Sequence, residues 1–534
     1  MKLGGFRKLI STVILTVAWA LYLTAGPSPT CLPSEVSAGA PAKIDPRAAL
    51  KNFEPLAVKA MAEWKVPGLA AAVIVDGKVV YAAGFGYRDL DKKLRVTPHT
   101  QFGIGSCSKA FTAATMAILA DEGKLDWDKP VRAYLPEFKL ADPIVGERAT
   151  VRDIVTHRTG LPRHDNVWIR SPLSRREMFE RLQFLDLSRD LRQAYQYNNL
   201  MFMTAGFLVG TVAGTSWEDF ARSRILEPLG MTETNFSVDD SRKAADFSRS
   251  YTLVHDAVEE FPFYNVDALG PAGSINSTVL DMARWIQLNI DEGRAPGSPP
   301  RTIVSEKQMA LLHSPQTIVP DELRYPELFY SSYGVGWRIN SYRGHPLLSH
   351  GGAIMGFSAL TAFLPKDKIG IILLNNLEDA PINEPLAYFV MDRLLGLEPV
   401  DWFGRLRADQ AEDKAKSEKA KAERDKDRRP GTVPSHPLPE YVGEYEHPAY
   451  GTIRVTLDEN GRLRADYHQR SYTVEHFHYD YFRFRNDWMD AEYLVSFATD
   501  AKGRIASFSI PLEPSVADIV FRLKPVAPAP EEKK

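Results

Sequence analysis

The chain has 534 residues, of which 44% are hydrophobic and 25% are charged. This length allows two or three domains with sizeable cores, and the composition is that of an ordinary globular protein. Lys and Arg total 65 against 68 Asp and Glu, for a formal net charge of −3. The chain therefore lacks the basic excess of nucleic-acid-binding proteins, and no nucleic-acid partner is predicted.

The first 40 residues have the pattern of a secretion signal. A basic start with Lys2, Arg7 and Lys8 is followed by an apolar run over 9–25 and then a stretch rich in Pro, Ser and Ala. This pattern predicts an exported protein, located in the periplasm or outside the cell. The apolar run of about 17 residues also approaches the length that spans a bilayer, so an uncleaved N-terminal membrane anchor is the alternative.

Helical and extended patterns over residues 41–405 predict one α+β domain. The dipeptide Asp76-Gly77 between two apolar runs predicts a β-hairpin near its start. Because strands stand at both ends with helices between them, we expect one sheet built from sequence-distant parts. Helices are predicted over 48–64, 150–156, 201–212, 216–225 and 278–293, and strands over 69–75, 78–83, 334–339, 347–350, 357–364 and 369–375.

The remainder of the chain divides into a linker and a small β domain. Residues 406–438 are first dominated by Ala, Lys, Glu, Asp and Arg and then by Pro, as in a solvated helical or extended linker. Residues 439–527 predict an antiparallel sheet or partial barrel whose Tyr and Phe side chains fill a core, and 528–534 form a tail. Its strands are predicted over 452–457, 463–467, 481–484, 493–498, 505–510 and 519–523.

A glycine-punctuated segment over 102–105 runs into a helix that is apolar nearly all round until residue 121. Such a helix belongs in the interior of a large domain. Ser106 opens the helix and Lys109 follows three residues later, so their side chains can meet. A buried lysine loses proton affinity and can act as a base beside a serine nucleophile. The alternative for Ser106 is a plain helix N-cap, and Cys107 is expected to be a small packing residue.

Two further segments carry polar side chains suited to such a site. Tyr197–Asn199 precedes a predicted helix, and His350–Ala353 follows a predicted strand. In this order, Ser-x-x-Lys, Tyr-x-Asn and His-x-Gly resemble the three signatures of the serine β-lactamase and penicillin-binding protein superfamily. The tyrosine in the second signature resembles the class C β-lactamase branch, with its D-aminopeptidases, DD-carboxypeptidases and esterases. The C-terminal region resembles a domain of unknown function that often follows such hydrolases.

The resemblance implies a fold and a set of catalytic roles. The fold is an antiparallel sheet flanked by helices plus an all-helical subdomain, with the site in the crevice between them. Ser106 would attack a carbonyl and become acylated, while Lys109 keeps its hydroxyl deprotonatable. Tyr197 would act as a phenolate base and later protonate the leaving group, and Asn199 would hold Lys109 and the substrate amide.

The third signature is implied to bind the substrate. Backbone N–H groups of Ser106 and Ala353 would form an oxyanion hole, and Gly351 and Gly352 would contact the substrate. No metal and no cofactor is implied, and the expected partner is a small-molecule or peptide substrate, with peptidoglycan-derived peptides as one class. The sequence leaves the oligomeric state open.

His350 stands where many relatives have a lysine. It would line the crevice and hydrogen-bond Tyr197 or the substrate. Because histidine is mostly neutral at pH 7, we expect weak recognition of a substrate carboxylate, and hence activity on small esters or D-amino-acid-containing peptides over β-lactams. Two alternatives stay open: a penicillin-binding or cell-wall-sensing protein that is acylated but turns over slowly, and a true β-lactamase.

Overall fold

A computed structural model of the chain describes residues 44–320, 324–486 and 491–525. The predicted signal or anchor over 1–40 and the tail over 528–534 lie outside the described residues. The helices are α1 (Pro46–Ala49), α2 (Phe53–Glu63), α3 (Ser108–Asp121), α4 (Pro143–Arg148), α5 (Val151–Val155), α6 (Arg175–Arg181), α7 (Asn199–Ala213), α8 (Trp217–Ala221), α9 (Glu227–Leu229), α10 (Val238–Ser241), α11 (Gly270–Gly273), α12 (Val279–Ile290), α13 (Glu306–Leu312), α14 (Asn383–Leu394) and α15 (Trp402–Lys426).

The strands before α14 are β1 (Gly68–Val75), β2 (Lys78–Asp89), β3 (Leu94–Arg95), β4 (Phe102–Gly103), β5 (Tyr251–Val254), β6 (Ala257–Glu260), β7 (Asn276–Ser277), β8 (Arg294–Ala295), β9 (Arg301–Thr302), β10 (Thr317–Ile318), β11 (Leu328–Tyr333), β12 (Arg338–Tyr342), β13 (His345–Ile354), β14 (Phe357–Leu364) and β15 (Ile369–Asn375). Those after α15 are β16 (Gly443–His447), β17 (Gly451–Leu457), β18 (Leu463–Tyr467), β19 (Arg470–His478), β20 (Tyr481–Asn486), β21 (Ala491–Thr499), β22 (Ile505–Ile510) and β23 (Ile519–Leu523).

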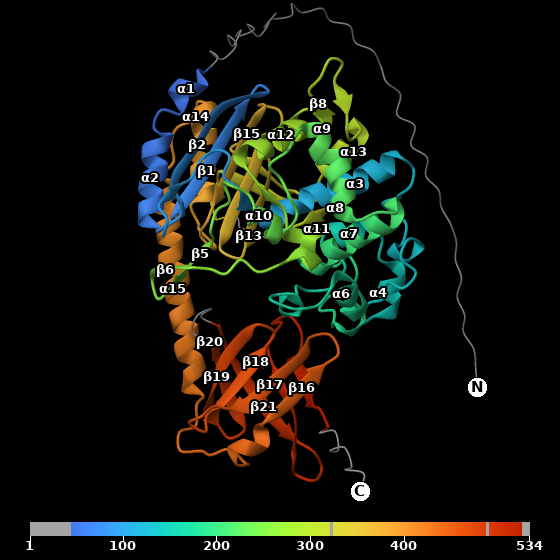
Figure 1. Cartoon of the computed structure of the whole chain (residues 1–534), viewed down its shortest axis with the longest axis vertical. Coiled ribbons are helices and arrows are strands. Elements are labelled where there is room, and N and C mark those ends of the chain that lie inside the picture. Colours follow the sequence, from blue (N-terminus) through green and yellow to red (C-terminus); the bar gives the residue numbers. More distant parts are fainter. Residues whose placement is uncertain (1–43, 321–323, 487–490, 526–534) are drawn as a thin grey trace, which may run out of the picture. The chain divides into compact units, whose positions relative to one another are not determined.

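A nine-stranded antiparallel sheet organises the N-terminal region, in the order β10-β11-β12-β13-β14-β15-β1-β2-β3 (Figure 1). Its central pairing joins β1 to β15, with Leu69 opposite Asn375 and Val75 opposite Ile369. These two strands come from opposite ends of the domain, so the expectation of a sheet built from sequence-distant parts is confirmed. The sheet has more strands than sequence patterns predicted, because short edge strands such as β3 and β10 carry little periodicity.

Helices cover both faces of this sheet, and alternate residues of β1 divide between them. Ala70, Ala72 and Ile74 belong to the core cluster that contains α12. Leu69, Ala71 and Val73 belong to the cluster that contains α2 and α14. Because both faces of β1 are buried, the strand is an unbroken run of apolar residues instead of an alternating one.

The helical part of the domain is centred on α3 and α7. Residues 108–119 of α3 are buried, as an all-round apolar helix requires. α3 begins at Ser108 and not at Ser106, because Gly105 has a φ of +50° and Ser106 lies in a 3₁₀ turn that leads into the helix.

Among the described residues no single helix could cross a membrane by length and hydropathy; α7 and the helical run Trp217–Leu229 meet that test only jointly, with a bend of 77° between them.

The strand predicted over 334–339 is wrong for its first four residues. Residues 334–337 form a turn between β11 and β12, and only 338 and 339 belong to β12. At Gly336, whose φ is +79°, an added Cβ would lie 2.9 Å from the Ala110 Cα of α3. This close approach of a turn to the site-bearing helix explains the glycine and interrupts the extended pattern.

The predicted linker is largely helical, since α15 covers its first part. The following β domain is a closed barrel, β16 to β23, and not a partial one. Closure comes from the pairing of β16 with β23, where Tyr445 lies opposite Leu523. The strands β16 and β19 were not among the predicted ones, although buried and exposed residues alternate along much of each.

Aromatic side chains fill the barrel. The rings of Tyr445 and Phe508 lie 4.8 Å apart, and those of Phe497 and Phe508 lie 5.3 Å apart. All three residues are buried, which supports a core role for the aromatic residues.

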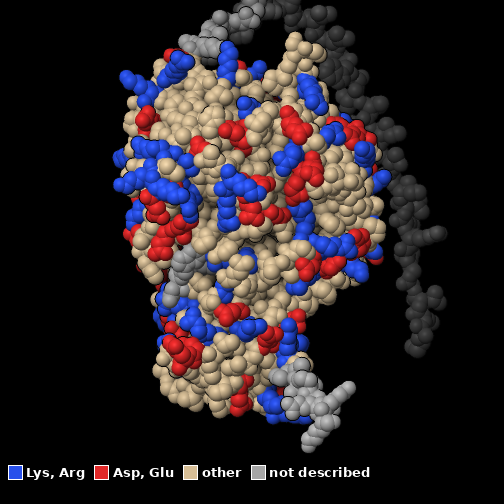
Figure 2. All heavy atoms as spheres, in the orientation of Figure 1, with Lys and Arg blue, Asp and Glu red and all other residues tan. Residues whose placement is uncertain are grey.

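On the surface, Lys and Arg are interspersed with Asp and Glu over the face drawn in Figure 2.

Candidate active site

Ser106 and Lys109 meet at the start of α3, as predicted. Lys109 Nζ lies 2.9 Å from Ser106 Oγ. It also lies 2.7 Å from Asn199 Oδ1, at the start of α7, and 2.8 Å from the carbonyl oxygen of Ala272 in α11. Lys109 is fully buried, whereas Ser106 is half-buried. Three sequence-distant elements therefore hold one amine beside one accessible hydroxyl.

The surroundings of Lys109 favour its neutral form. Burial lowers the pKa of Lys109 well below 10.5, and the nearby positive charge of Arg163 lowers it further. A neutral amine has two N–H donors and one lone pair. Asn199 Oδ1 and the Ala272 carbonyl can take both donors, so the lone pair is left for the hydroxyl of Ser106. This arrangement suits a general base acting on that hydroxyl.

Tyr197 and Asn199 enter the site where α7 begins. Asn198, between them, caps α7, because its side chain accepts a hydrogen bond from the N–H of Met201. This cap fixes the backbone of Tyr197 and Asn199 on either side. Lys109 Nζ lies 4.8 Å from the centre of the Tyr197 ring. Burial raises the pKa of Tyr197, outweighing the opposite effect of its hydrogen bond with Ser106. A raised pKa disfavours the phenolate that the resemblance implied and keeps Tyr197 a proton donor.

His350 faces a different tyrosine from the one named in the sequence prediction. Its Nε2 accepts from the Tyr333 hydroxyl at 3.0 Å and its Nδ1 donates to the Gly351 carbonyl at 2.6 Å, while its ring centre lies 6.3 Å from that of Tyr197. Burial, with a contribution from the charge of Lys109, lowers the pKa of His350 to about 3. His350 is therefore neutral at physiological pH, which is the condition for the expected weak recognition of a substrate carboxylate.

The strand β13 approaches the turn around Ser106 very closely. A Cβ added at Gly352 would lie 2.0 Å from the Ile104 carbonyl oxygen and 3.2 Å from the Ser106 nitrogen. A Cβ added at Gly105 would lie 2.8 Å from the Ala353 nitrogen. The two backbone N–H groups predicted for an oxyanion hole thus belong to backbone segments in contact.

Cys107 is a packing residue, as expected. It is buried, and its Sγ donates to the His350 carbonyl oxygen at 3.1 Å. Burial raises the pKa of its thiol to about 12, so the reactive thiolate is disfavoured.

Sequence reasoning missed the polar residues that surround this centre. Asp165 accepts from Asn199 Nδ2 at 3.1 Å and from Arg163 Nε at 2.6 Å. The Arg163 guanidinium lies 5.1 Å from the centre of the Tyr197 ring. The ring of His157, which is buried, lies 4.4 Å from the Tyr197 ring, centre to centre, and is tilted by 37° against it. No sequence pattern described above marked Asp165.

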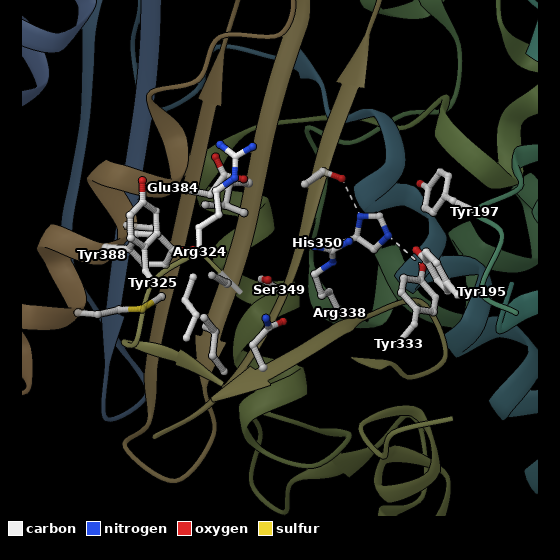
Figure 3. Close-up of a pocket in the computed structure, with 18 of the residues that line it drawn as sticks. Tyr195, Tyr197, Arg324, Tyr325, Tyr333, Arg338, Ser349, His350, Glu384 and Tyr388 are labelled. Atoms are coloured by element: carbon white, nitrogen blue, oxygen red, sulfur yellow. Dashed lines mark hydrogen bonds between the residues drawn. The ribbon is translucent and has the colours of Figure 1, made fainter. Parts of the chain in front are cut away.

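A cavity of about 790 Å³ adjoins the site. Its lining includes Tyr197, His350 and Gly351 on one side, with Tyr195 and Tyr333 beside them. Figure 3 shows these aromatic side chains gathered around His350, and a second group including Tyr388 at the other end. Ser106 is not part of the lining and lies next to it, so a substrate in this cavity could present a carbonyl to the serine.

Comparisons with known proteins agree with this geometry. A model of the family described as Beta-lactamase matches residues 53–394, and one described as Domain of unknown function (DUF3471) matches 427–524. The unguisins hydrolase ungD of Aspergillus violaceofuscus is 30% identical over 468 residues, covering 81% of this chain and 82% of the relative. The unguisins hydrolase ungD' of Aspergillus campestris is 29% identical over 431 residues, covering 77% and 79%.

A solved structure shows the same arrangement over both regions. The octameric penicillin-binding protein homologue from Pyrococcus abyssi aligns with a TM-score of 0.59 and 25% identity, covering 89% of this chain and 99% of that one. The matched family model spans most of the hydrolase-like region and includes all three signatures. This chain belongs to the beta-lactamase family of hydrolases and carries a C-terminal DUF3471 domain.

Proposed function

We propose that the protein is an exported serine hydrolase that cleaves ester or amide bonds through an acyl-enzyme on Ser106. The main support for this proposal is the buried Lys109 amine, which lies 2.9 Å from Ser106 Oγ in surroundings that favour its neutral form. Export rests on the signal-like pattern of residues 1–40.

The chemistry follows from the positions of the side chains. Lys109 takes the proton of Ser106 as Oγ attacks the substrate carbonyl, and the backbone N–H groups of Ser106 and Ala353 stabilise the resulting oxyanion. Tyr197 gives its proton to the leaving alcohol or amine, and the ammonium of Lys109 restores it. Water then attacks the acyl-enzyme while Lys109 accepts one of its protons. The bond between the acyl carbon and Oγ breaks, and Lys109 passes the proton to Oγ, which releases the acid and regenerates Ser106.

The site favours substrates without a strong carboxylate anchor. His350 is neutral and bonded to Tyr333, so it supplies no cation where many relatives place a lysine. The tyrosines at the His350 end of the cavity suit an apolar acyl group or a peptide side chain, while Arg163, Arg324, Arg338 and Glu384 also line the cavity. Hydrolysis of small esters or D-amino-acid-containing peptides is therefore preferred over β-lactam hydrolysis, and the likeness to unguisins hydrolases supports a hydrolytic role.

Intact-mass measurement after incubation with p-nitrophenyl acetate, a D-Ala-D-Ala peptide and benzylpenicillin tests this proposal. We expect an acyl adduct that maps to Ser106, and steady-state turnover that is faster on the ester or the peptide than on the β-lactam. Ser106→Ala is the control and should form no adduct. A single burst without turnover would favour a slowly deacylating penicillin-binding protein. Benzylpenicillin turnover equal to the best ester would favour a β-lactamase, and unchanged turnover by Ser106→Ala would refute the proposal.

The pH dependence of kcat/KM should show the protonation of the general base, Lys109. Activity is expected to fall as pH falls, because protonated Lys109 cannot accept the Ser106 proton. The midpoint should lie well below 10.5, since burial and Arg163 lower the pKa of Lys109, and His350 should add no transition near pH 6.5 because its pKa is about 3. Arg163→Gln removes a positive charge and should move the midpoint to higher pH. Arg176→Gln, which alters a surface arginine paired with Glu180, is the matched control; a midpoint that Arg163→Gln leaves unmoved or lowers would contradict the assignment.

A further inference from the structure

The loop over 163–168 lies between the active site and the barrel. On its site-facing side, Asp165 accepts from Asn199 Nδ2 at 3.1 Å. A carboxylate can only accept, so this bond turns the amide of Asn199 with its Oδ1 toward Lys109, 2.7 Å away. Arg163 donates to the other oxygen of Asp165 at 2.6 Å. Arg163 and Asp165 of the loop therefore orient Asn199, the residue that holds the base.

His164 and Asn166 of the same loop bind the barrel. The backbone N–H of His164 donates to Glu513 Oε2 at 3.0 Å, and His164 Nδ1 lies 2.7 Å from the Tyr450 hydroxyl. His164 is fully buried and has a φ of +47°, a left-handed conformation that is uncommon for histidine and is kept only where its surroundings enforce it.

Asn166 directs its side chain and its carbonyl group to the barrel. Its Nδ2 donates to the Leu512 carbonyl at 3.0 Å, and its Oδ1 accepts from Arg470 Nη1 at 2.8 Å. Its backbone carbonyl accepts from the Tyr467 hydroxyl at 2.7 Å. Arg470 and Tyr467 are both at least 95% buried, so these are bonds to fixed partners and not to mobile surface groups.

From this arrangement we infer that the C-terminal barrel positions the catalytic lysine through the 163–168 loop, so that the DUF3471 domain is needed for full hydrolytic activity. The inference rests on the proposed function, because it assigns positioning residues to that same site. The contacts of Asn166 and Tyr467 fix the loop to the barrel. Asp165 in the fixed loop then orients the amide of Asn199, which in turn positions Lys109. Within the loop, Asp165 is held by Arg163 and by Trp168 Nε1, which donates to Asp165 Oδ1 at 2.7 Å. Loss of the barrel contacts therefore frees the loop, and Asp165 with it, to move.

The test uses the full chain and hydrolysis of p-nitrophenyl acetate. Asn166→Ala removes both side-chain bonds to the barrel, and Tyr467→Phe removes one hydroxyl while keeping the ring. Arg181→Met is the matched control, because Arg181 Nη1 donates to the barrel residue Ala449 but does not touch the loop. We expect Asn166→Ala and Tyr467→Phe each to lower kcat at least about 10-fold with little change in KM, and Arg181→Met to leave both within two-fold.

A double-mutant cycle separates positioning from general weakening of the fold. If the barrel acts through Asp165, adding Asn166→Ala to Asp165→Asn should lower kcat no further. Losses that multiply, or unchanged kcat in Tyr467→Phe, would overturn the inference, and Tyr467→Phe keeps the test decisive if Asn166→Ala fails to fold. A wild-type protein without an acyl adduct on Ser106 would instead refute the proposed function, so the two failures are distinct.

Discussion

Lys109→Met is expected to lower kcat/KM by about 10⁴-fold, because it removes the only buried amine beside Ser106 Oγ among the described residues and leaves the hydroxyl without a base. Methionine is one atom shorter than lysine and is apolar, so it fills most of the space that the lysine side chain occupies. Asn199 Oδ1 and the Ala272 carbonyl lose a donor, which costs about 1–3 kcal/mol for each group. Relief from burying a polar amine offsets part of this cost. The loss of activity should therefore far exceed the loss of stability, as measured by kinetics and thermal unfolding on one preparation.

Lys109→Arg distinguishes a base from a mere positive charge. Arginine keeps the cation but is protonated at all accessible pH values, so it cannot take the serine proton. We expect it to be as inactive as Lys109→Met. Activity near the wild-type level in Lys109→Arg would show that the charge is what matters and would return the role of base to Tyr197.

Gly352→Ala is the second substitution with a large expected effect. The added Cβ would lie 2.0 Å from the Ile104 carbonyl oxygen, a backbone atom that cannot rotate away. β13 must then move from the Ser106 turn, which separates the two N–H groups of the oxyanion hole. Loss of one such donor costs about 100-fold or more in kcat, so we expect at least that decrease.

Gly351→Ala is the matched control for this steric argument. A Cβ at Gly351 meets only the Ala359 carbonyl oxygen, at an ordinary 3.9 Å. We expect its kcat to fall less than 10-fold, with circular dichroism confirming that both variants are folded. Equal losses in the two variants would mean that contact with substrate, and not the approach of Gly352 to Ile104, sets the requirement for glycine.

Much of the site could be read from the sequence because its chemistry is local. The spacing of Ser106 and Lys109 brings their side chains together whatever the rest of the fold, and the apolar helix that follows requires burial of the lysine. The strands β14 and β15 were predicted with their observed bounds, since both are largely apolar runs bounded by turn residues.

Other features depend on contacts between distant segments, and no local pattern carries them. The choice of Tyr333 over Tyr197 as the partner of His350 depends on how β11 and β13 lie in one sheet. The pairing of β16 with β23 closes the barrel, and the register of such a pair is set by packing across the whole sheet.

The sequence by itself determined the family fold, and it predicted the nucleophile, its lysine neighbour and a neutral histidine in the third signature. Only the tertiary structure decided that Lys109 has two fixed acceptors, that Gly352 must lack a side chain, and that the 163–168 loop joins Asn199 to the barrel. The reason is physical: periodicity and residue type report short-range geometry, whereas the orientation of Asn199 is set by Asp165, 34 positions away, and by a barrel that begins far beyond both.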